Sequence, residues 1–269
     1  MLSLIVQRFI LLLVLFNTLT FLGQSTASQQ VMTFDIEAPQ LPGERRIWVY
    51  VPQRYDATKE AFPVMYMFDG QNIFDKESSY AGEWGVDEYL DTIKADHIIV
   101  AIDHGNEERL NELTPYQNPE YGGGEGDLFL EFIITRLKPY IDANFRTITN
   151  AGGTSIAGAS LGGLMAYYAL IKHQDVFSKA IALSPSFWIN PEIKELTEKT
   201  IIKDSSKFYI VIGADEGELM ISAYQPFLEV LLNKELTPQQ YYMELVEGGR
   251  HNEEFWQAQF KQAYRWLFK

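Results

Sequence analysis

A G-x-S-x-G pentapeptide spans residues 158–162, with Ser160 at its centre. Apolar residues at 156–157 predict the end of a strand before it, and apolar residues from Leu164 predict a helix after it. A serine on so tight a turn projects its hydroxyl from the sheet edge, and glycines leave room for the turn. N–H groups at the start of the helix favour developing negative charge. The segment predicts Ser160 as a nucleophile; the alternative is a glycine-rich turn with an ordinary serine.

A serine hydroxyl is a weak nucleophile until a base removes its proton. His251 follows the apolar run 241–246 and is the one histidine after Ser160 that lies in a loop at the C-terminal end of a predicted strand. We therefore predict His251 as the base. The other histidines start a predicted strand, end the helix after the pentapeptide, or lie in a long loop where a substrate contact is possible: His97, His173 and His104.

An acid that orients the histidine should lie between Ser160 and His251, because this architecture runs serine, acid, histidine. The predicted strand 208–212 ends in an acidic turn that holds three carboxylates: Asp215, Glu216 and Glu218. One of them should accept a hydrogen bond from the His251 ring. The spacing alone leaves all three open.

Two N–H donors are needed to stabilise the oxyanion. One should be the backbone of Leu161, directly after the nucleophile. The other should come from the loop after the predicted strand 63–68, where Gly70 permits close approach and Gln71 is the candidate donor. An ordinary Asp-Gly turn is the alternative interpretation of that loop.

Near-continuous apolar runs alternate with helical patterns along the whole chain, which predicts an α/β fold with a mainly parallel sheet and helices on both faces. Two N-terminal segments, 31–36 and 46–51, predict an antiparallel pair. We expect one domain over residues 28–269. The remaining strands and helices are expected at 63–68, 97–102, 151–157, 179–183, 208–212 and 241–246, and at 86–93, 129–141, 164–170 and 255–267.

The longest irregular stretch, 104–126, leaves the C-terminal end of a predicted strand, where open α/β sheets place ligands. In it, Arg109 could bind an anionic substrate group, although pairing with Glu112 at i,i+3 is the favoured interpretation. Trp84 and Trp188 could stack on a sugar or an aromatic acyl group. Large aromatic residues lie more often in the core.

The 269 residues include no cysteine and carry a formal charge of −14, so nucleic acid is an unfavourable partner and no thiolate site is possible. Residues 1–27 contain one charge, an apolar run at 9–16, and Ser25 and Ala27 as a small-x-small cleavage site. They predict a signal peptide and export to the periplasm or the extracellular space. The chain would contact a membrane only through this segment, if it stays uncleaved.

The chain resembles the Putative esterase family of α/β-hydrolases, which includes esterase D-like enzymes, siderophore esterases such as enterochelin esterases, feruloyl and acetyl-xylan esterases, and mycolyltransferases. The resemblance runs from about Pro39 to the C-terminus and rests on four segments: 68–74 (FDGQNIF), 156–163 (IAGASLGG), 182–188 (ALSPSFW) and 249–252 (GRHN).

This resemblance implies an α/β-hydrolase fold and a serine ester hydrolase without metal or organic cofactor. It selects Glu216 as the acid, with Asp215 as the alternate. The implied substrate is a small-molecule or carbohydrate-linked ester with a small acyl, hydroxycinnamoyl or siderophore group. An acyltransferase using the same acyl-enzyme and a non-catalytic binding protein on this scaffold are the other possibilities.

Overall fold

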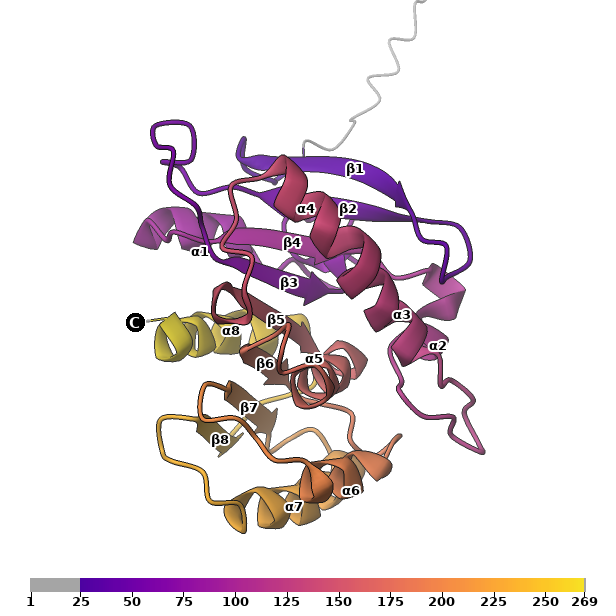
Figure 1. Cartoon of the computed structure of the whole chain (residues 1–269). Helices are drawn as coiled ribbons and strands as arrows, with labels where there is room; N and C mark the ends of the chain where they lie inside the picture. The colour runs from indigo at the N-terminus through magenta and orange to yellow at the C-terminus, as the bar shows by residue number, and fades with distance from the viewer. Residues whose placement is uncertain (1–24, 269) are drawn as a thin grey trace, which may run out of the picture.

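Eight strands form one sheet in the order β1-β2-β4-β3-β5-β6-β7-β8 (Figure 1). The computed structural model describes residues 25–268. β1 and β2 pair antiparallel, β2 pairs antiparallel with β4, and all the later pairs are parallel. The strands are β1 (Val31–Glu37), β2 (Glu44–Tyr50), β3 (Val64–Phe68), β4 (Ile98–Ile102), β5 (Thr154–Ala159), β6 (Lys179–Leu183), β7 (Lys207–Gly213) and β8 (Tyr241–Val246).

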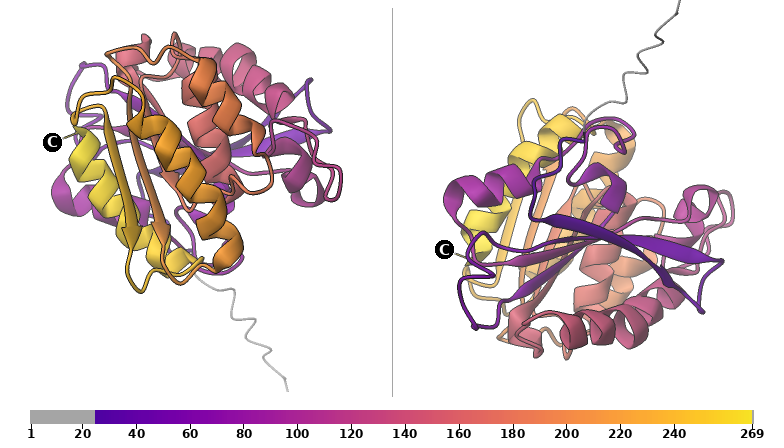
Figure 2. Two further views of the ribbon diagram at one scale, coloured as in Figure 1. Left: turned by 90° about the horizontal axis from the view of Figure 1, so that it is seen from below. Right: turned by 90° about the horizontal axis from the view of Figure 1, so that it is seen from above.

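Helices cover both faces of the sheet (Figure 2). The α-helices are α1 (Val86–Ile93), α2 (Arg109–Glu112), α3 (Gly126–Phe132), α4 (Lys138–Asn144), α5 (Leu161–Lys172), α6 (Glu192–Lys199), α7 (Glu218–Leu232) and α8 (Glu253–Phe268). Three short 3₁₀ turns, η1 (Gly70–Asn72), η2 (Asn106–Glu108) and η4 (Ala151–Gly153), and one π-helical turn, η3 (Ile133–Leu137), complete the elements.

The alternation of side chains along each strand divides the core into two layers. On β3, Tyr66 and Phe68 pack with residues of α3 to α7 on one face, whereas Met65 and Met67 pack with residues of α1 and α8 on the other. All five residues of β3 are buried, because helices lie over both of its faces. This arrangement explains why the central strands are continuous apolar runs rather than alternating ones.

The predicted fold class is confirmed: a mainly parallel sheet with an antiparallel N-terminal pair and helices around it. The strand expected at 151–157 begins later, at Thr154, because η4 precedes it and the Asn150 side chain caps that turn. The sequence analysis missed α2, α6 and α7. α2 is one short turn within the stretch 104–126 that was expected to be irregular. α6 is short and strongly charged, and α7 carries Pro226 in its interior, which ordinarily argues against a helix.

Most of the predicted signal peptide, residues 1–24, lies outside the described residues. The part that is described, residues 25–27, runs beside an acidic side chain: Ser25 Oγ donates to Asp75 Oδ2 at 2.9 Å, and Thr26 N donates to Asp75 Oδ1 at 3.1 Å. Directly after it, Ser28 N donates to Asp87 Oδ2 at 2.7 Å. Among residues 25–268, no helix is both long enough and apolar enough to cross a membrane.

Candidate active site

The polar side chains of the site follow the carboxyl ends of the parallel strands, which meet at one edge of the sheet. Asp69 follows β3, Ser160 follows β5 and Ser184 follows β6. Glu216 and His251 lie in the segments after β7 and β8. Residues far apart in the sequence therefore converge because the topology places their strand ends side by side.

Ser160 occupies a strained turn between β5 and α5, with φ 58° and ψ −121°. This backbone region is unfavourable for any residue with a side chain and persists only where the surrounding structure enforces it. The turn is closely packed: a Cβ atom on Gly158 would lie 2.4 Å from the carbonyl oxygen of Gly162. A Cβ on Gly163 would lie 2.6 Å from the carbonyl oxygen of Leu183. These glycines are thus required by the tightness of the turn.

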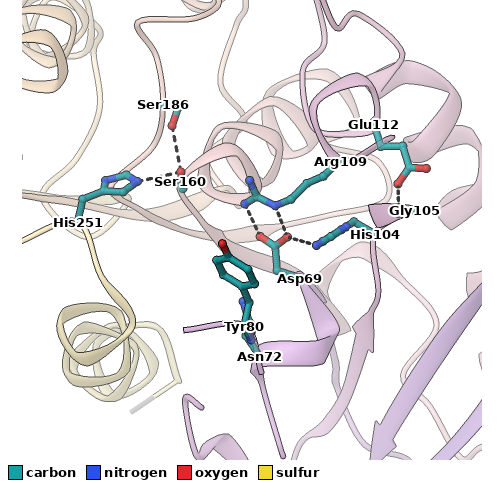
Figure 3. A network of polar contacts seen from close by, with 10 residues as sticks. All are labelled: Asp69, Asn72, Tyr80, His104, Gly105, Arg109, Glu112, Ser160, Ser186 and His251. Carbon is teal, nitrogen blue, oxygen red and sulfur yellow. Dashed lines mark hydrogen bonds and ion pairs between the residues drawn. The ribbon is translucent and has the colours of Figure 1, made fainter. Parts of the chain in front are cut away.

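Ser160, His251 and Glu216 form a continuous hydrogen-bonded row. Ser160 Oγ lies 2.9 Å from His251 Nε2, and His251 Nδ1 lies 2.9 Å from Glu216 Oε2 (Figure 3 shows the first contact). Because an ionised carboxylate can only accept, Nδ1 carries the proton and Nε2 is free to accept from the serine. In that tautomer, the unprotonated Nε2 lies within hydrogen-bond distance of the Ser160 hydroxyl.

Glu216 is the carboxylate of the acidic turn that contacts His251. Its side chain is fully buried, and its second oxygen, Oε1, accepts from Ser184 Oγ at 2.5 Å and from Gly213 N at 2.7 Å. Asp215 is exposed, and Asp215 N donates to Gly249 O. The turn thus directs Glu216 inward and leaves Asp215 at the surface.

The backbone N–H groups of Leu161 and Gln71 make no hydrogen bond with other groups among the described residues. Both lie at the first turn of a helical segment, where N–H groups lack intrahelical acceptors. Gln71 and Ser160 line the same cavity. These two donors are therefore available to a negatively charged oxygen bound near the serine.

Arg109 forms a bidentate ion pair with Asp69, so the favoured pairing with Glu112 is wrong. Arg109 Nε and Nη2 donate to the two Asp69 oxygens at 2.7 and 2.9 Å (Figure 3). Burial opposes the charge on Arg109, but the Asp69 carboxylate attracts it and raises its pKa above the ordinary value. Glu112 is instead fully buried, bonded to Arg45 of β2 and to the Gly105 N–H.

A cavity of about 340 Å³ opens over Ser160 and His251. It is also lined by Asp69, Gln71, Asn72, Tyr80, His104, Arg109, Glu253 and Trp256. His104, considered above as a substrate contact, does line it, and burial lowers the pKa of its imidazole. The sequence analysis did not name Asp69 or Trp256 as site residues. The position of Asp69 directly after a buried strand could have indicated that it lies in the site.

The two tryptophans proposed for substrate stacking do not line this cavity. Trp84 is 4% exposed and packs against Trp256 and Phe260 in the core. Trp188 lies edge-to-face with Tyr121 of the long loop and lines a different cavity of about 290 Å³ between α6 and α7. The structure thus brings Arg109, but neither tryptophan, next to Ser160.

One group of carboxylates in the described chain is close enough to hold a cation. Oxygens of Glu83, Asp87 and Glu88 lie within 4.8 Å of one another at the start of α1. Burial and the neighbouring Asp87 raise the pKa of Glu88 to about 7, so a proton can relieve part of the repulsion. None of these three residues lines the cavity over Ser160.

The fold and the arrangement of the site define an α/β-hydrolase-like architecture: a strained serine turn follows a central parallel strand, and a histidine follows the last strand. The chain belongs to the family described as Putative esterase, whose model matches residues 38–267. The family assignment supports ester hydrolysis as its activity.

The chain is also similar to other proteins and solved structures. The chain is 25% identical over 239 residues to "Uncharacterized protein YbbA" of Bacillus subtilis, a match covering 84% of this chain and 93% of that protein. It is 31% identical over 136 residues to a "Siderophore triacetylfusarinine C esterase" of Aspergillus fumigatus, covering 48% and 45% of the two chains. The crystal structure of BES protein from Bacillus cereus superposes with a TM-score of 0.74 at 22% identity, covering 91% and 97%.

Proposed function

We propose that this protein is an exported serine carboxylic-ester hydrolase in which Ser160, His251 and Glu216 act as the catalytic triad. The observation that carries the proposal is the row Ser160 Oγ–His251 Nε2 and His251 Nδ1–Glu216 Oε2, with both contacts at 2.9 Å and an open cavity above them. The predicted signal peptide at residues 1–27 supports the export route.

In the acylation step, Ser160 Oγ attacks the ester carbonyl while His251 Nε2 accepts the hydroxyl proton. The negative charge that develops on the carbonyl oxygen is stabilised by the N–H groups of Leu161 and Gln71. Glu216 holds the imidazole tautomer and stabilises the imidazolium. As the tetrahedral intermediate collapses, His251 protonates the departing alcohol, and the acyl group remains on Ser160.

In the deacylation step, a water molecule loses a proton to His251 Nε2 and attacks the acyl-enzyme carbonyl. The acid is then released when the proton returns to Ser160 Oγ. The cavity of about 340 Å³ suits an ester with a small acyl or hydroxycinnamoyl group, or one ester arm of a siderophore. Its charged lining residues are Asp69, Arg109 and Glu253, and the first two neutralise each other.

The decisive test is Ser160→Ala, assayed on p-nitrophenyl acetate and with a fluorophosphonate probe. We expect kcat to fall by at least about 10⁴ and labelling to disappear, because the nucleophile is removed. Ser155→Ala is the matched control: Ser155 lies on the same strand, β5, and its hydroxyl bonds only Val64 O. Unchanged hydrolysis by Ser160→Ala would refute the assignment.

Substrate class is tested by a hydrolysis screen of acetylated xylan, feruloyl esters, siderophores and short acyl nitrophenyl esters. Because an alcohol could replace water in deacylation, the same reactions are repeated with added sugar or glycerol, and the products are analysed by mass spectrometry. Free acid as the main product supports a hydrolase. A new ester as the main product supports an acyltransferase instead.

A further inference from the structure

The turn after β6 contacts both ends of the row formed by Ser160, His251 and Glu216. Ser184 Oγ donates to Glu216 Oε1 at 2.5 Å. Two residues later, Ser186 Oγ lies 3.3 Å from Ser160 Oγ, and Ser186 N donates to the Ser160 carbonyl at 3.1 Å (Figure 3). The segment 182–188 therefore has a place in the site that the proposed mechanism does not use.

Ser184 is held in an unfavourable backbone conformation. Its φ is 44°, in the left-handed region, and its side chain is fully buried. Its N–H donates to Val211 O at 2.7 Å, so the backbone is fixed by β7. Glycine would adopt this conformation with less strain. What serine adds over glycine at this position is the hydroxyl, which lies between Glu216 and Trp256.

Trp256, the fourth residue of α8, fixes the direction of the Ser184 hydroxyl. Trp256 Nε1 donates to Ser184 Oγ at 2.8 Å. A hydroxyl has one hydrogen, and the indole N–H can only donate, so that hydrogen is left to point at Glu216. The Trp256 ring also packs edge-to-face on the His251 ring, with centroids 4.9 Å apart and planes at 86°.

We propose that Trp256 and Ser184 form a positioning relay that holds the Glu216 carboxylate in place and, through it, the His251 ring. This inference rests on the proposed function. Glu216 Oε1 takes the Ser184 hydroxyl and the Gly213 N–H, which leaves Oε2 for His251 Nδ1. Without the hydroxyl, the Gly213 N–H would be the one donor besides His251 to hold the buried carboxylate, and the carboxylate would be free to turn away from the ring.

The first test compares Ser184→Ala with Ser184→Gly. Both remove the hydroxyl, but glycine also relieves the strain at φ 44°, whereas alanine keeps it. We expect kcat to fall by about 10- to 100-fold in both variants, the value of a hydrogen bond to a charged group, with KM changed less than about twofold. Ser155→Ala, which also removes a buried serine hydroxyl, should leave kcat unchanged. A loss in alanine alone would assign the effect to backbone strain and overturn the relay.

The second test is Trp256→Phe, which keeps an aromatic ring beside His251 and removes the N–H. We expect kcat to fall by about 3- to 10-fold, the value of an ordinary hydrogen bond. In the Ser184→Ala background the same change should cost less than about twofold, because the N–H acts through the missing hydroxyl. Trp266→Phe is the control on the same helix, since Trp266 packs on Tyr209 and Tyr242. Fully additive losses would overturn the relay.

A third measurement separates positioning from general damage to the fold. In Ser184→Ala, the acid limb of the kcat/KM profile should move to lower pH, because a carboxylate that has turned away from the ring stabilises the imidazolium less. An unmoved limb with reduced stability would show a merely structural role. If Ser160→Ala is inactive while the Ser184 variants are normal, the relay is wrong and the proposed function stands; an active Ser160→Ala refutes the function itself.

Discussion

The Arg109 guanidinium and the Asp69 carboxylate form a bidentate ion pair, with Nε–Oδ1 at 2.7 Å and Nη2–Oδ2 at 2.9 Å. Asp69 follows β3 in the left-handed backbone region, at φ 58°, and starts the turn that carries Gln71. The ion pair therefore ties the long loop after β4 to the turn whose N–H we assign to the oxyanion. Arg109 is also partly exposed to the cavity, with 31% of its side chain accessible.

Arg109→Lys should reduce kcat by about 10- to 100-fold on neutral esters, because lysine keeps the charge but cannot form the planar fork. Asp69→Asn should cause a similar loss, and the double variant should lose little more than either single one, since both remove the same contact. Steady-state kinetics on a neutral nitrophenyl ester checks this. Arg136→Lys, at an exposed position on η3, is the control.

A different outcome would assign Arg109 to substrate recognition. If Arg109 binds an anionic substrate group directly, Arg109→Lys and Arg109→Met should raise KM for carboxylated esters and leave neutral esters unaffected. The comparison of the two substrate types with the same variants decides between the two roles.

The sequence was sufficient for the fold class because burial dictates it. Strands covered on both faces must be apolar throughout, as at β3 and β4, and both of these runs end at an aspartate, Asp69 and Asp103. The glycine pattern around Ser160 was equally informative, because a turn that brings Gly158 against Gly162 excludes side chains there. Both features follow from local constraints that a sequence records directly.

The partners of the charged residues were not predictable in this way. Arg109 and Glu112 lie at i,i+3 on α2, yet Glu112 points to Arg45 of β2 and Arg109 points to Asp69 after β3. Likewise, Ser184 and Trp256 meet across 72 positions of the chain. Such contacts depend on which side chains the topology brings together at one sheet edge, and pairwise spacing carries no signal for them.

Gly158→Ala should destabilise the protein by about 3 kcal/mol and abolish activity. The added Cβ would lie 2.4 Å from the Gly162 carbonyl oxygen, a backbone atom that can move only if the elbow opens. Urea unfolding measures the first effect, and nitrophenyl ester hydrolysis measures the second. Gly152→Ala is the control, since its nearest neighbour is a side-chain oxygen of Asn150 at 3.2 Å. Equal stabilities of the two variants would contradict the steric argument.

His97 should make the fold sensitive to acid. Burial lowers the pKa of its imidazole to about 4, with nearby Lys179 lowering it further and Asp96 partly opposing. Its Nδ1 lies 2.6 Å from Tyr264 Oη. The ordinary value is 6.5, so the unfolded chain binds this proton more tightly than the folded one. The contribution of the neutral His97 to the free energy of unfolding is fully present above about pH 6.5. It is lost progressively as the pH falls towards 4, by roughly 3 kcal/mol.

Urea unfolding of wild type and His97→Gln between pH 7 and pH 4 checks this prediction. Glutamine lowers the absolute stability by removing a buried ring, so the informative quantity is the slope of unfolding free energy against pH. The slope should be smaller in the variant. Parallel slopes would exclude His97 as the group responsible.

The backbone nitrogen of Ser28 lies 2.7 Å from Asp87 Oδ2, and Asp87 is fully buried. Its other oxygen, Oδ1, has no hydrogen-bond partner among residues 25–268, and oxygens of Glu83 and Glu88 lie within 4.8 Å. Cleavage after Ala27, as the small-x-small pattern predicts, would turn this amide into an α-ammonium group beside three carboxylates. The hydrogen bond from the neutral Ser28 amide to Asp87 would then become a hydrogen bond from a charged ammonium group.

A chain that starts at Ser28 should therefore be more stable than one that starts at Ala27, by about 1.5 to 3 kcal/mol, or several degrees in Tm. The two chains differ by one residue, and both lack the Ser25 and Thr26 contacts with Asp75, so those contacts cannot account for a difference. Asp87→Asn should remove most of the difference, because the amide cannot pair with the ammonium charge. Thermal unfolding of the four proteins measures this, and mass spectrometry of the exported chain identifies its first residue. Equal Tm values, or a mature chain that begins elsewhere, would show that these carboxylates do not receive the new N-terminus.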